Sequence, residues 1–428
     1  MIIMEILIKN GRVIDPASGT DDSLDIVING NIISDMGRGL NRSDCDEVID
    51  AKGALVLPGL IDMHVHFREP GREDVETIIG GSIVAAKSGF TSVCTMPNTS
   101  PVIDNQALAR FVIMEAAKGP INVFPAANVT KGGRGEEISE MGELVKGGAV
   151  AFTDDGRPVA DSIVMRRALE YSRMFDVPIL THSEDKSLTD EGLINEGFNS
   201  IRLGLKGIPR EAEEVMIARD IILTRLTNGR LHVCHVSSTG SVELIRRGKA
   251  DGIKVTCETA PHYFSLTDDA VEEHLSMAKM NPPLRTETDR KEIIRGLKDG
   301  TIDVIATDHA PHALFEKMQE LEYAPFGIIG LETAVPLIIT ELVRNNNFSY
   351  IEAFSKVTCN PSRLLKLGRG ELKAGSIADV TIINPDEKIV VDDRFLKSRC
   401  KNTPFIGKEL YGSIRYTICG GKIVYRNS

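Results

Sequence analysis

The central part of the chain alternates short apolar segments with longer amphipathic segments. A short apolar run between turn signals predicts a buried strand, and an apolar stripe with helical periodicity predicts a helix that covers the sheet. Strands are expected near residues 60–66, 90–96, 121–127, 148–154, 177–182, 231–236, 253–258 and 303–308. Helices are expected near residues 75–88, 104–118, 137–146, 161–174, 210–228, 239–249, 288–299 and 330–345. This alternation predicts a (β/α)8 barrel of the TIM type, with an open doubly wound α/β sheet as the alternative.

The two ends of the chain follow a different pattern, in which short apolar strands are separated by glycine turns. Near the N-terminus, the dipeptides Asn10-Gly11 and Asn29-Gly30 lie between alternating apolar segments, which is a strong signal for β-hairpins. The same pattern returns near the C-terminus. We therefore expect residues 1–56 and 371–428 to form one small β-sandwich beside a barrel made of residues 57–370.

Polar and ionisable residues gather where the predicted strands end. His64 and His66 stand two positions apart at the end of the first barrel strand, so their side chains leave the same face of an extended strand. Pro70-Gly71 then ends that segment. In a parallel barrel the C-terminal ends of all strands meet at one mouth, where active sites are built. An open sheet would leave some of these residues at its edges, so their distribution favours the barrel.

The fifth and sixth predicted strands also end in histidine. His182 closes the fifth strand, and the sixth contains His232 and His235. In an extended strand His235 shares a face with Leu231 and Val233, whereas His232 points the other way. We therefore expect His232 to face the helices or to be structural. The candidate metal ligands are His64, His66, His182 and His235.

Four histidines exceed the three protein ligands of a typical open zinc site. Two metal ions that share a bridging carboxylate explain the set better, and the end of the fourth strand offers Asp154 and Asp155 for this role. Asp308 follows the eighth strand on the same parity as the apolar Val304 and Ala306. A carboxylate beside a metal-activated hydroxide can take its proton and return it to a leaving nitrogen, so Asp308 is the expected general base and acid.

Composition limits the classes of partner. The chain has 428 residues and a formal net charge of -11, which argues against nucleic acid or an anionic membrane surface as its main partner. No run approaches the roughly 18 apolar residues that a membrane helix needs. The seven cysteines are scattered and odd in number, which is typical of reduced thiols. We expect a cytoplasmic protein that acts on a small molecule.

Two stretches of the sequence are specific enough to identify a family. Residues 64–71 read HVHFREPG, and residues 306–312 read ATDHAPH, with Lys317 following. Together with the run APFG at 324–327, they resemble the dihydroorotases of the amidohydrolase superfamily, and the resemblance extends over the whole chain. It implies reversible hydrolysis of (S)-dihydroorotate to N-carbamoyl-L-aspartate in de novo pyrimidine biosynthesis. The expected chemistry is attack of a metal-activated hydroxide on the ring amide, with Asp308 carrying the proton.

The resemblance also implies roles for the other site residues. Many relatives bridge their metal ions with a carboxylated lysine on the fourth strand, but residues 149–155 contain no lysine. The sequence is similar instead to a subgroup with the motif Asp-Asp-Gly, in which the second aspartate, Asp155, bridges a site for one or two zinc ions. Arg68 offers a bidentate fork suited to a substrate carboxylate. The implied substrate-binding residues are Arg68, Asn98, Asn281, His312, Phe326 and Gly327.

The family resemblance is compatible with a homodimer and with an association with aspartate carbamoyltransferase, which some members form. Another cyclic amidohydrolase, an allantoinase or a hydantoinase, is the nearest alternative function, and the missing lysine argues against it. A non-catalytic scaffold homologue is the alternative from a different class. Such a protein is recognised by lost ligands, and none is missing from this sequence.

Overall fold

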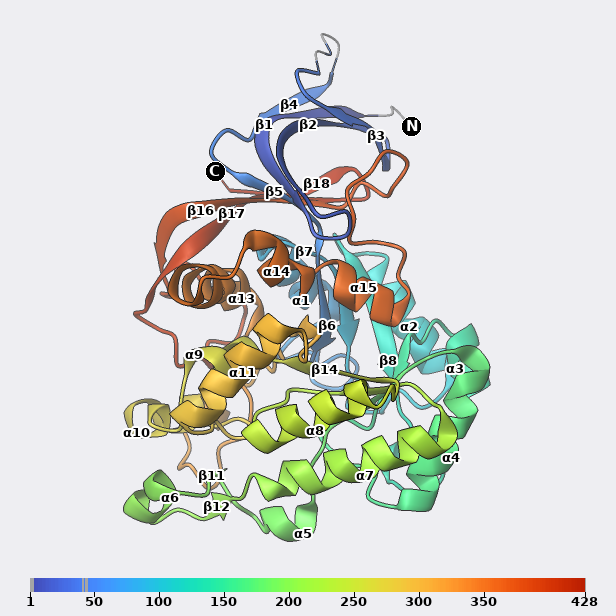
Figure 1. Ribbon diagram of the computed structural model, residues 1–428, viewed down its shortest axis with the longest axis vertical. Helices are drawn as coiled ribbons and strands as arrows, with labels where there is room; N and C mark the ends of the chain where they lie inside the picture. The colour runs from blue at the N-terminus through green and yellow to red at the C-terminus, as the bar shows by residue number, and fades with distance from the viewer. Residues whose placement is uncertain (1–3, 41, 43–44, 428) are drawn as a thin grey trace.

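The computed structural model describes residues 4–40, 42 and 45–427. Its two large sheets have eight strands each and lie one above the other along the long axis of the molecule (Figure 1). One sheet is the parallel sheet of the central segment, and the other is built from both chain ends. No helix in the described ranges is long and apolar enough to cross a membrane.

The central segment forms the predicted parallel barrel. All eight expected strands are present, and each pairs with the next along the chain from β6 to β15. Their bounds are β6 Leu60–Val65, β7 Phe90–Thr95, β8 Asn122–Ala127, β9 Ala151–Phe152, β10 Ile179–Thr181, β13 Leu231–Val233, β14 Val255–Thr259 and β15 Val304–Ile305. Beyond the last strand, His309 forms a parallel bridge to Val65 of the first. This contact brings the two ends of the sheet together, so the open-sheet alternative is wrong.

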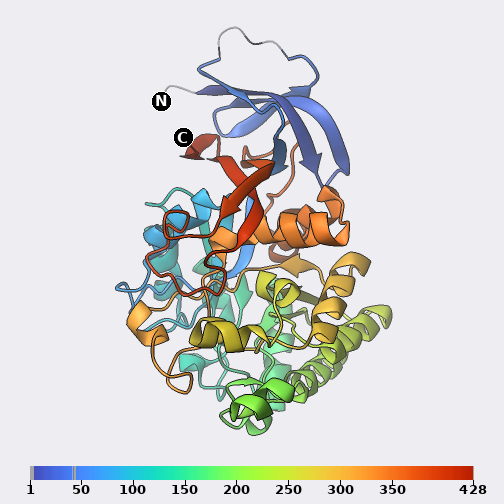
Figure 2. The ribbon, with the colours of Figure 1, turned by 90° about the vertical axis from the view of Figure 1, so that its left-hand side faces the viewer.

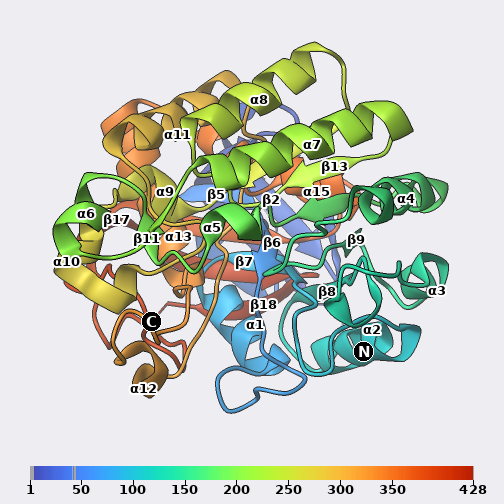
Figure 3. The same ribbon diagram turned by 90° about the horizontal axis from the view of Figure 1, so that it is seen from below.

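The predicted helices surround the strands, as Figure 3 shows in a view toward the strand ends. They lie where the amphipathic pattern predicted them: α1 Ile78–Lys87, α2 Gln106–Ala116, α3 Met141–Lys146, α4 Ser162–Ser172, α7 Glu211–Thr227, α8 Thr239–Ala250, α11 Glu287–Asp299 and α13 Leu331–Leu337. The last continues as a π-helical segment over Ile338–Asn345. Local capping fixes several starts; the side chain of Asp161, for example, accepts from the backbone of Ile163 and Val164 before α4.

Several short elements were not predicted, because each is too brief to show a period. Most lie in the loops that follow the barrel strands. After β10 come α5 Lys186–Thr189, β11 Ile194–Asn195, α6 Phe198–Leu203 and β12 Gly207–Ile208. After β14 and β15 come α9 Pro261–Ser265, α10 Ala270–His274, the 3-10 turn Leu275–Ala278 and α12 Leu314–Lys317. The remaining ones are α14 Tyr350–Ser355, α15 Cys359–Leu365 and the 3-10 turns Lys131–Gly133 and Arg173–Phe175.

Both chain ends join in one continuous sheet, seen in blue and red beside the barrel in Figure 2. Its strands are β1 Glu5–Asp15, β2 Thr20–Asn29, β3 Ile32–Gly37, β4 Glu47–Asp50, β5 Leu55–Pro58, β16 Val380–Val390, β17 Glu409–Cys419 and β18 Lys422–Arg426. β5 pairs with β1 on one side and with β16 on the other, so it joins the two ends. Residues from both ends, such as Ile26, Ile49 and Val380, share one buried cluster.

The hairpin prediction is confirmed at one of the two Asn-Gly dipeptides and is wrong at the other. Asn29-Gly30 makes the predicted hairpin turn between β2 and β3, where Asn29 pairs with Ile32. The expected hairpin at Asn10-Gly11 is wrong. β1 runs through this dipeptide, and its register with β2 shifts between Ile8 and Gly11. Asn10 takes a φ of 61°, so the left-handed residue makes a bulge within one strand.

The contact between the β17–β18 turn and Gly30 gives a test of this sheet. An added Cβ at Gly421 (φ 74°) would overlap the carbonyl oxygen of Gly30, whereas at Gly420 (φ 54°) it would meet nothing within 4 Å. Gly420→Ala should lower the free energy of unfolding by about 1–2 kcal/mol through backbone strain. Gly421→Ala should cost about 1–3 kcal/mol more, because overlap is added to strain. Urea unfolding of both variants measures the difference; equal losses would contradict the close approach.

Candidate active site

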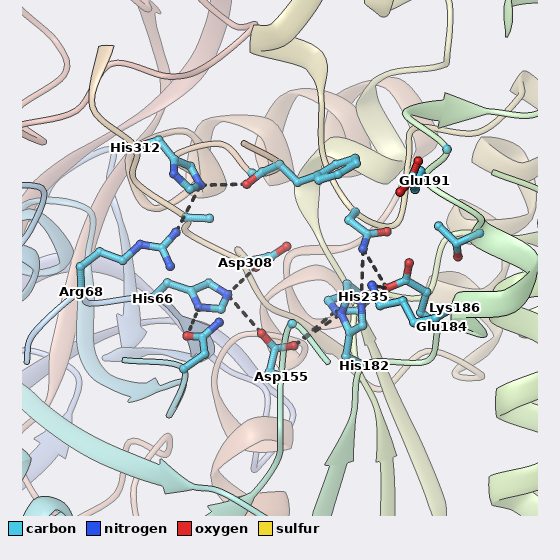
Figure 4. A pocket seen from close by; sticks show the side chains of 18 of the residues that line it. His66, Arg68, Asp155, His182, Glu184, Lys186, Glu191, His235, Asp308 and His312 are labelled. Carbon is cyan, nitrogen blue, oxygen red and sulfur yellow. Dashed lines mark hydrogen bonds and ion pairs between the residues drawn. The ribbon is translucent and has the colours of Figure 1, made fainter. Parts of the chain in front are cut away.

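A cavity of about 570 Å3 opens where the barrel strands end (Figure 4). Every residue expected at the site lies in its wall except His64, which is fully buried. The expected residues in the wall are His66, Arg68, Asn98, Asp155, His182, His235, Asn281, Asp308, His312, Phe326 and Gly327. The fold therefore gathers side chains from widely separated strand ends around one space.

The two histidines of the first strand differ in their surroundings. The pairing of β6 with β7 shifts register between Asp62 and Val65, so this strand end is irregular. Nδ1 of His64 lies 2.6 Å from a carboxylate oxygen of Glu258. Nδ1 of His66 lies 3.0 Å from the side-chain oxygen of Asn98. In each ring Nδ1 therefore contacts a side-chain oxygen of the protein, and Nε2 lies on the opposite side of the ring.

Asp155 lies at the centre of the histidine cluster. Its Oδ2 is 3.6 Å from Nε2 of His64 and 3.4 Å from Nε2 of His66. Its Oδ1 is 3.7 Å from Nδ1 of His182 and 3.6 Å from Nε2 of His235. Burial would raise the pKa of this carboxyl, but the facing histidines, His64 first, hold the pKa well below its usual value. Each oxygen of one carboxylate thus faces its own pair of imidazoles.

The neighbouring aspartate is engaged elsewhere. Oδ1 of Asp154 accepts from the side-chain amide of Asn128 at 3.0 Å and from the backbone of Thr130 at 3.1 Å. The Thr130 hydroxyl donates to its other oxygen. Of the two candidate carboxylates on this strand, only Asp155 faces the histidines.

The parity argument for the sixth strand is wrong, although His235 does line the cavity. Leu231 and Val233 pack in the cluster shared with the outer helices. His232 instead lies inside the barrel, with Nε2 at 3.2 Å from Glu258. His235 reaches the cavity because its φ of 36° turns the backbone out of the extended strand. Of the two alternatives for His232, the helix-facing one is wrong, because strand parity was counted through the turn at His235. The structural one agrees with its contacts to Glu258 and Thr256.

Asp308 comes from the last strand but lies beside the first. Its Oδ1 is 3.1 Å from Nε2 of His66. The junction is fixed one residue earlier, where the hydroxyl of Thr307 donates to Asp62 at 2.6 Å. Asp62 also accepts from the backbone N–H of His64 at 3.1 Å. Burial opposes ionisation of Asp308, but His66 and the other histidines hold its pKa below the usual value, so this carboxyl is ionised.

Arg68 forms the cationic side of the cavity. Its Nε donates to the carbonyl of Pro311 at 3.2 Å, and Nη2 lies 3.3 Å from Nε2 of His312. Within the described part of the chain, no carboxylate lies within ion-pair distance of this guanidinium. Burial, aided by the charge of Arg68, lowers the pKa of His312 to about 3, so this imidazole is neutral. A half-buried guanidinium with only neutral partners is a site for an anion.

The opposite wall contains acidic and basic residues that the sequence analysis did not select. Oε2 of Glu184 is 3.0 Å from Nε2 of His182 and accepts from the amide of Asn281 at 3.1 Å. Lys186 donates to the same oxygen. The available signal was position, because Glu184 follows His182 by two residues at a strand end. The sequence analysis also missed Glu258, because residue spacing along its own strand does not indicate which histidine on another strand it contacts.

The arrangement fits a divalent metal ion. His64, Asp155 and His235 offer ligand atoms within 4.8 Å of one another, and so do His64, His66 and Asp308. Among the described residues, Nε2 of His64 and Oδ1 of Asp155 are buried without a hydrogen-bond partner. Imidazole nitrogen and carboxylate oxygen are common ligands of zinc and related ions. A cluster of this kind at the mouth of a parallel barrel is suited to metal-assisted hydrolysis.

Comparison with known proteins gives the family. A model of the dihydro-orotase-like family matches residues 53–241. The dihydroorotase of Pelobacter propionicus is 52% identical over 424 residues, covering 99% of this chain and 100% of that protein. The dihydroorotase of Acetivibrio thermocellus is 50% identical over 421 residues, covering 98% and 99%. The chain belongs to the dihydroorotase family.

Solved structures of lower identity share the fold. The L-hydantoinase (dihydropyrimidinase) of Arthrobacter aurescens superposes with a TM-score of 0.89 at 22% identity, covering 99% of this chain and 96% of that one. The dihydropyrimidinase of Brevibacillus agri superposes with a TM-score of 0.86 at 23% identity, covering 99% and 95%. Both agree with the barrel and with the additional sheet formed by the chain ends.

Proposed function

We propose that this protein is a cytoplasmic dihydroorotase that interconverts (S)-dihydroorotate and N-carbamoyl-L-aspartate in pyrimidine biosynthesis. The supporting observation is the pairing, in one cavity, of a histidine–aspartate cluster with a half-buried guanidinium that has no carboxylate partner among the described residues. Substrate and product both carry a carboxylate that takes no part in the reaction and can serve as an anchor. Relatives about half identical over their full length have the name dihydroorotase.

The residues that would hold the metal are two pairs of histidines, one pair at each oxygen of Asp155. His64 and His66 face one carboxylate oxygen, and His182 and His235 face the other. We propose zinc, as one or two ions per chain, with Asp155 as the bridging ligand. A metal ion held by these residues would lower the pKa of water and polarise the ring amide carbonyl.

Asp308 is placed to move the proton. Its carboxylate is ionised and lies 3.1 Å from His66, at the edge of the cluster, so it can accept a proton from the attacking water. Returning that proton to the ring nitrogen makes the nitrogen a neutral leaving group. In the closing direction the same carboxylate removes the proton from the ureido nitrogen.

The remaining residues orient the substrate. The fork of Arg68 matches the substrate carboxylate, and Asn98, Asn281 and His312 offer hydrogen bonds around the ring. Phe326 and Gly327 complete the wall. Their segment is fixed from behind by Lys317, whose Nζ donates to the carbonyls of Pro325 at 2.9 Å and Gly327 at 3.0 Å. A fixed wall holds the ring amide against the cluster.

Substrate comparison tests the function directly. The enzyme should hydrolyse dihydroorotate faster than hydantoin or allantoin, because only dihydroorotate offers Arg68 a carboxylate; faster turnover of allantoin would refute the proposal. The homodimer and the association with aspartate carbamoyltransferase stay predictions. Size-exclusion chromatography with and without that enzyme examines both.

The two adjacent aspartates provide a matched test of the metal site. In Asp155→Asn, metal affinity and turnover should both fall. Each should fall by more than the roughly 10–100-fold that loss of a hydrogen-bond partner of a metal ligand costs. Asp154→Asn should retain its metal, because the Asp154 side chain bonds to Asn128 and Thr130 rather than facing the histidines. Elemental analysis of the purified variants, alongside the dihydroorotate assay, measures both. Metal and turnover retained in Asp155→Asn would rule out the bridge.

Loss of the proton carrier should affect rate more than binding. Asp308→Asn keeps the shape of the side chain but accepts no proton, so kcat should fall about 100- to 10,000-fold in both directions with a small change in KM. Steady-state kinetics with dihydroorotate and with N-carbamoyl-L-aspartate provide the measurement. Turnover near that of the wild type would eliminate this role for Asp308.

Loss of the cationic anchor should affect binding. Arg68→Gln removes charge-assisted hydrogen bonds worth about 1.5–3 kcal/mol, so KM for dihydroorotate should rise about 10- to 100-fold. Dihydrouracil has the same ring without the carboxylate, so its inhibition constant should be unchanged. An equal loss for both compounds would show that Arg68 supports the fold of the pocket rather than the carboxylate.

A further inference from the structure

A buried carboxylate lies inside the barrel beneath the cavity, and the mechanism above does not use it. Glu258 belongs to β14 and is 1% exposed. One of its oxygens is 2.6 Å from Nδ1 of His64, and the other is 3.2 Å from Nε2 of His232. Glu258 is not part of the cavity wall, so substrate does not reach it.

Histidines are the side chains placed to balance the negative charge of Glu258. Within the described residues, its ion-pair partners are His64 and His232, with no lysine or arginine among them. A buried carboxylate without compensation is costly. A dication on the far nitrogen of the His64 ring would compensate this charge through the imidazole.

The hydrogen bonds fix which nitrogen of each ring carries a proton. A carboxylate only accepts, so Nδ1 of His64 and Nε2 of His232 must both donate. His64 then presents the lone pair of Nε2, which points toward Asp155 and has no hydrogen-bond partner among the described residues. Nδ1 of His232 accepts from the hydroxyl of Thr256 at 2.9 Å. His232 thereby holds the second oxygen of Glu258 and fixes the rotation of the carboxylate.

The geometry points to Glu258 as a positioning residue for the metal site: it holds His64 in the tautomer and orientation that direct Nε2 at the ion, and His232 holds Glu258. This inference rests on the proposed function, because it takes His64 to be a metal ligand. By accepting the hydrogen bond from Nδ1–H, Glu258 also makes Nε2 of His64 a stronger electron-pair donor to a metal ion.

The test compares two buried glutamates that each meet a histidine. Glu258→Gln in the full-length, metal-free protein should weaken zinc binding about 10- to 100-fold, measured by competition with a chelator. The free energy of unfolding of the metal-free protein should not fall, because the substitution removes a buried charge and keeps its shape. A merely structural role would lower that free energy and leave zinc affinity unchanged.

Glu76→Gln is the matched control. Glu76 is 3% exposed, and its carboxylate is 3.0 Å from Nε2 of His309, which is not among the proposed ligands. Zinc affinity should be unchanged in this variant. Wild-type affinity in Glu258→Gln, or an equal loss in Glu76→Gln, would overturn the inference. Failure of the proposed function is distinct, since the wild type itself would then bind no metal or leave dihydroorotate intact.

A structure of the zinc-loaded wild type decides the matter if Glu258→Gln does not fold. We expect His64 to coordinate through Nε2 while Nδ1 remains bonded to Glu258. Coordination through Nδ1, or separation of Glu258 from the ring, would overturn the inference, because one nitrogen cannot both donate to the carboxylate and bind the ion.

Discussion

The site depends on closure of the parallel barrel. β6 and β15 lie at opposite ends of the sheet, and the hydrogen bond between Thr307 and Asp62 joins residues 245 positions apart. Asp62 also holds the backbone of His64, while Thr307 precedes Asp308. The proposed first ligand and the proposed proton carrier are therefore placed by the same buried carboxylate. Any loosening of this junction would move both sides of the reacting centre at once.

The cavity separates charge into two regions. Histidines and acidic side chains surround Asp155, while Arg68 lies across the space with neutral partners. Two buried lysines stabilise the wall on the Arg68 side, since Lys317 and Lys279 donate to backbone carbonyls of the segment 321–327. In the proposed reaction this division would orient the substrate, because the carboxylate and the reacting amide of one small ring require opposite surroundings.

The sheet from the chain ends supports the other end of the barrel. Hydroxyls of Thr381 and Thr417 donate to backbone carbonyls at the end of α1 and just beyond it. β5 leads directly into β6, so the strand that carries His64 and His66 is anchored in this sheet. The N- and C-terminal segments therefore contribute to the rigidity of the site, and Asn402 contacts its wall directly, since its Oδ1 accepts from the backbone N–H of His312 at 3.2 Å.

The sequence by itself determined the barrel, because eight alternations of apolar strand and amphipathic helix leave few other ways to bury the strands. It also placed the site, since ionisable residues at parallel strand ends must meet. Tertiary structure alone decided which partner each side chain takes. The left-handed backbone at His235 took this residue off the face that it was expected to share with Leu231 and Val233, and hydrogen bonds from Thr130 turned Asp154 away while Asp155 faced the histidines. Glu258 contacts His64 and His232 through packing across strands, which residue spacing along one strand does not encode.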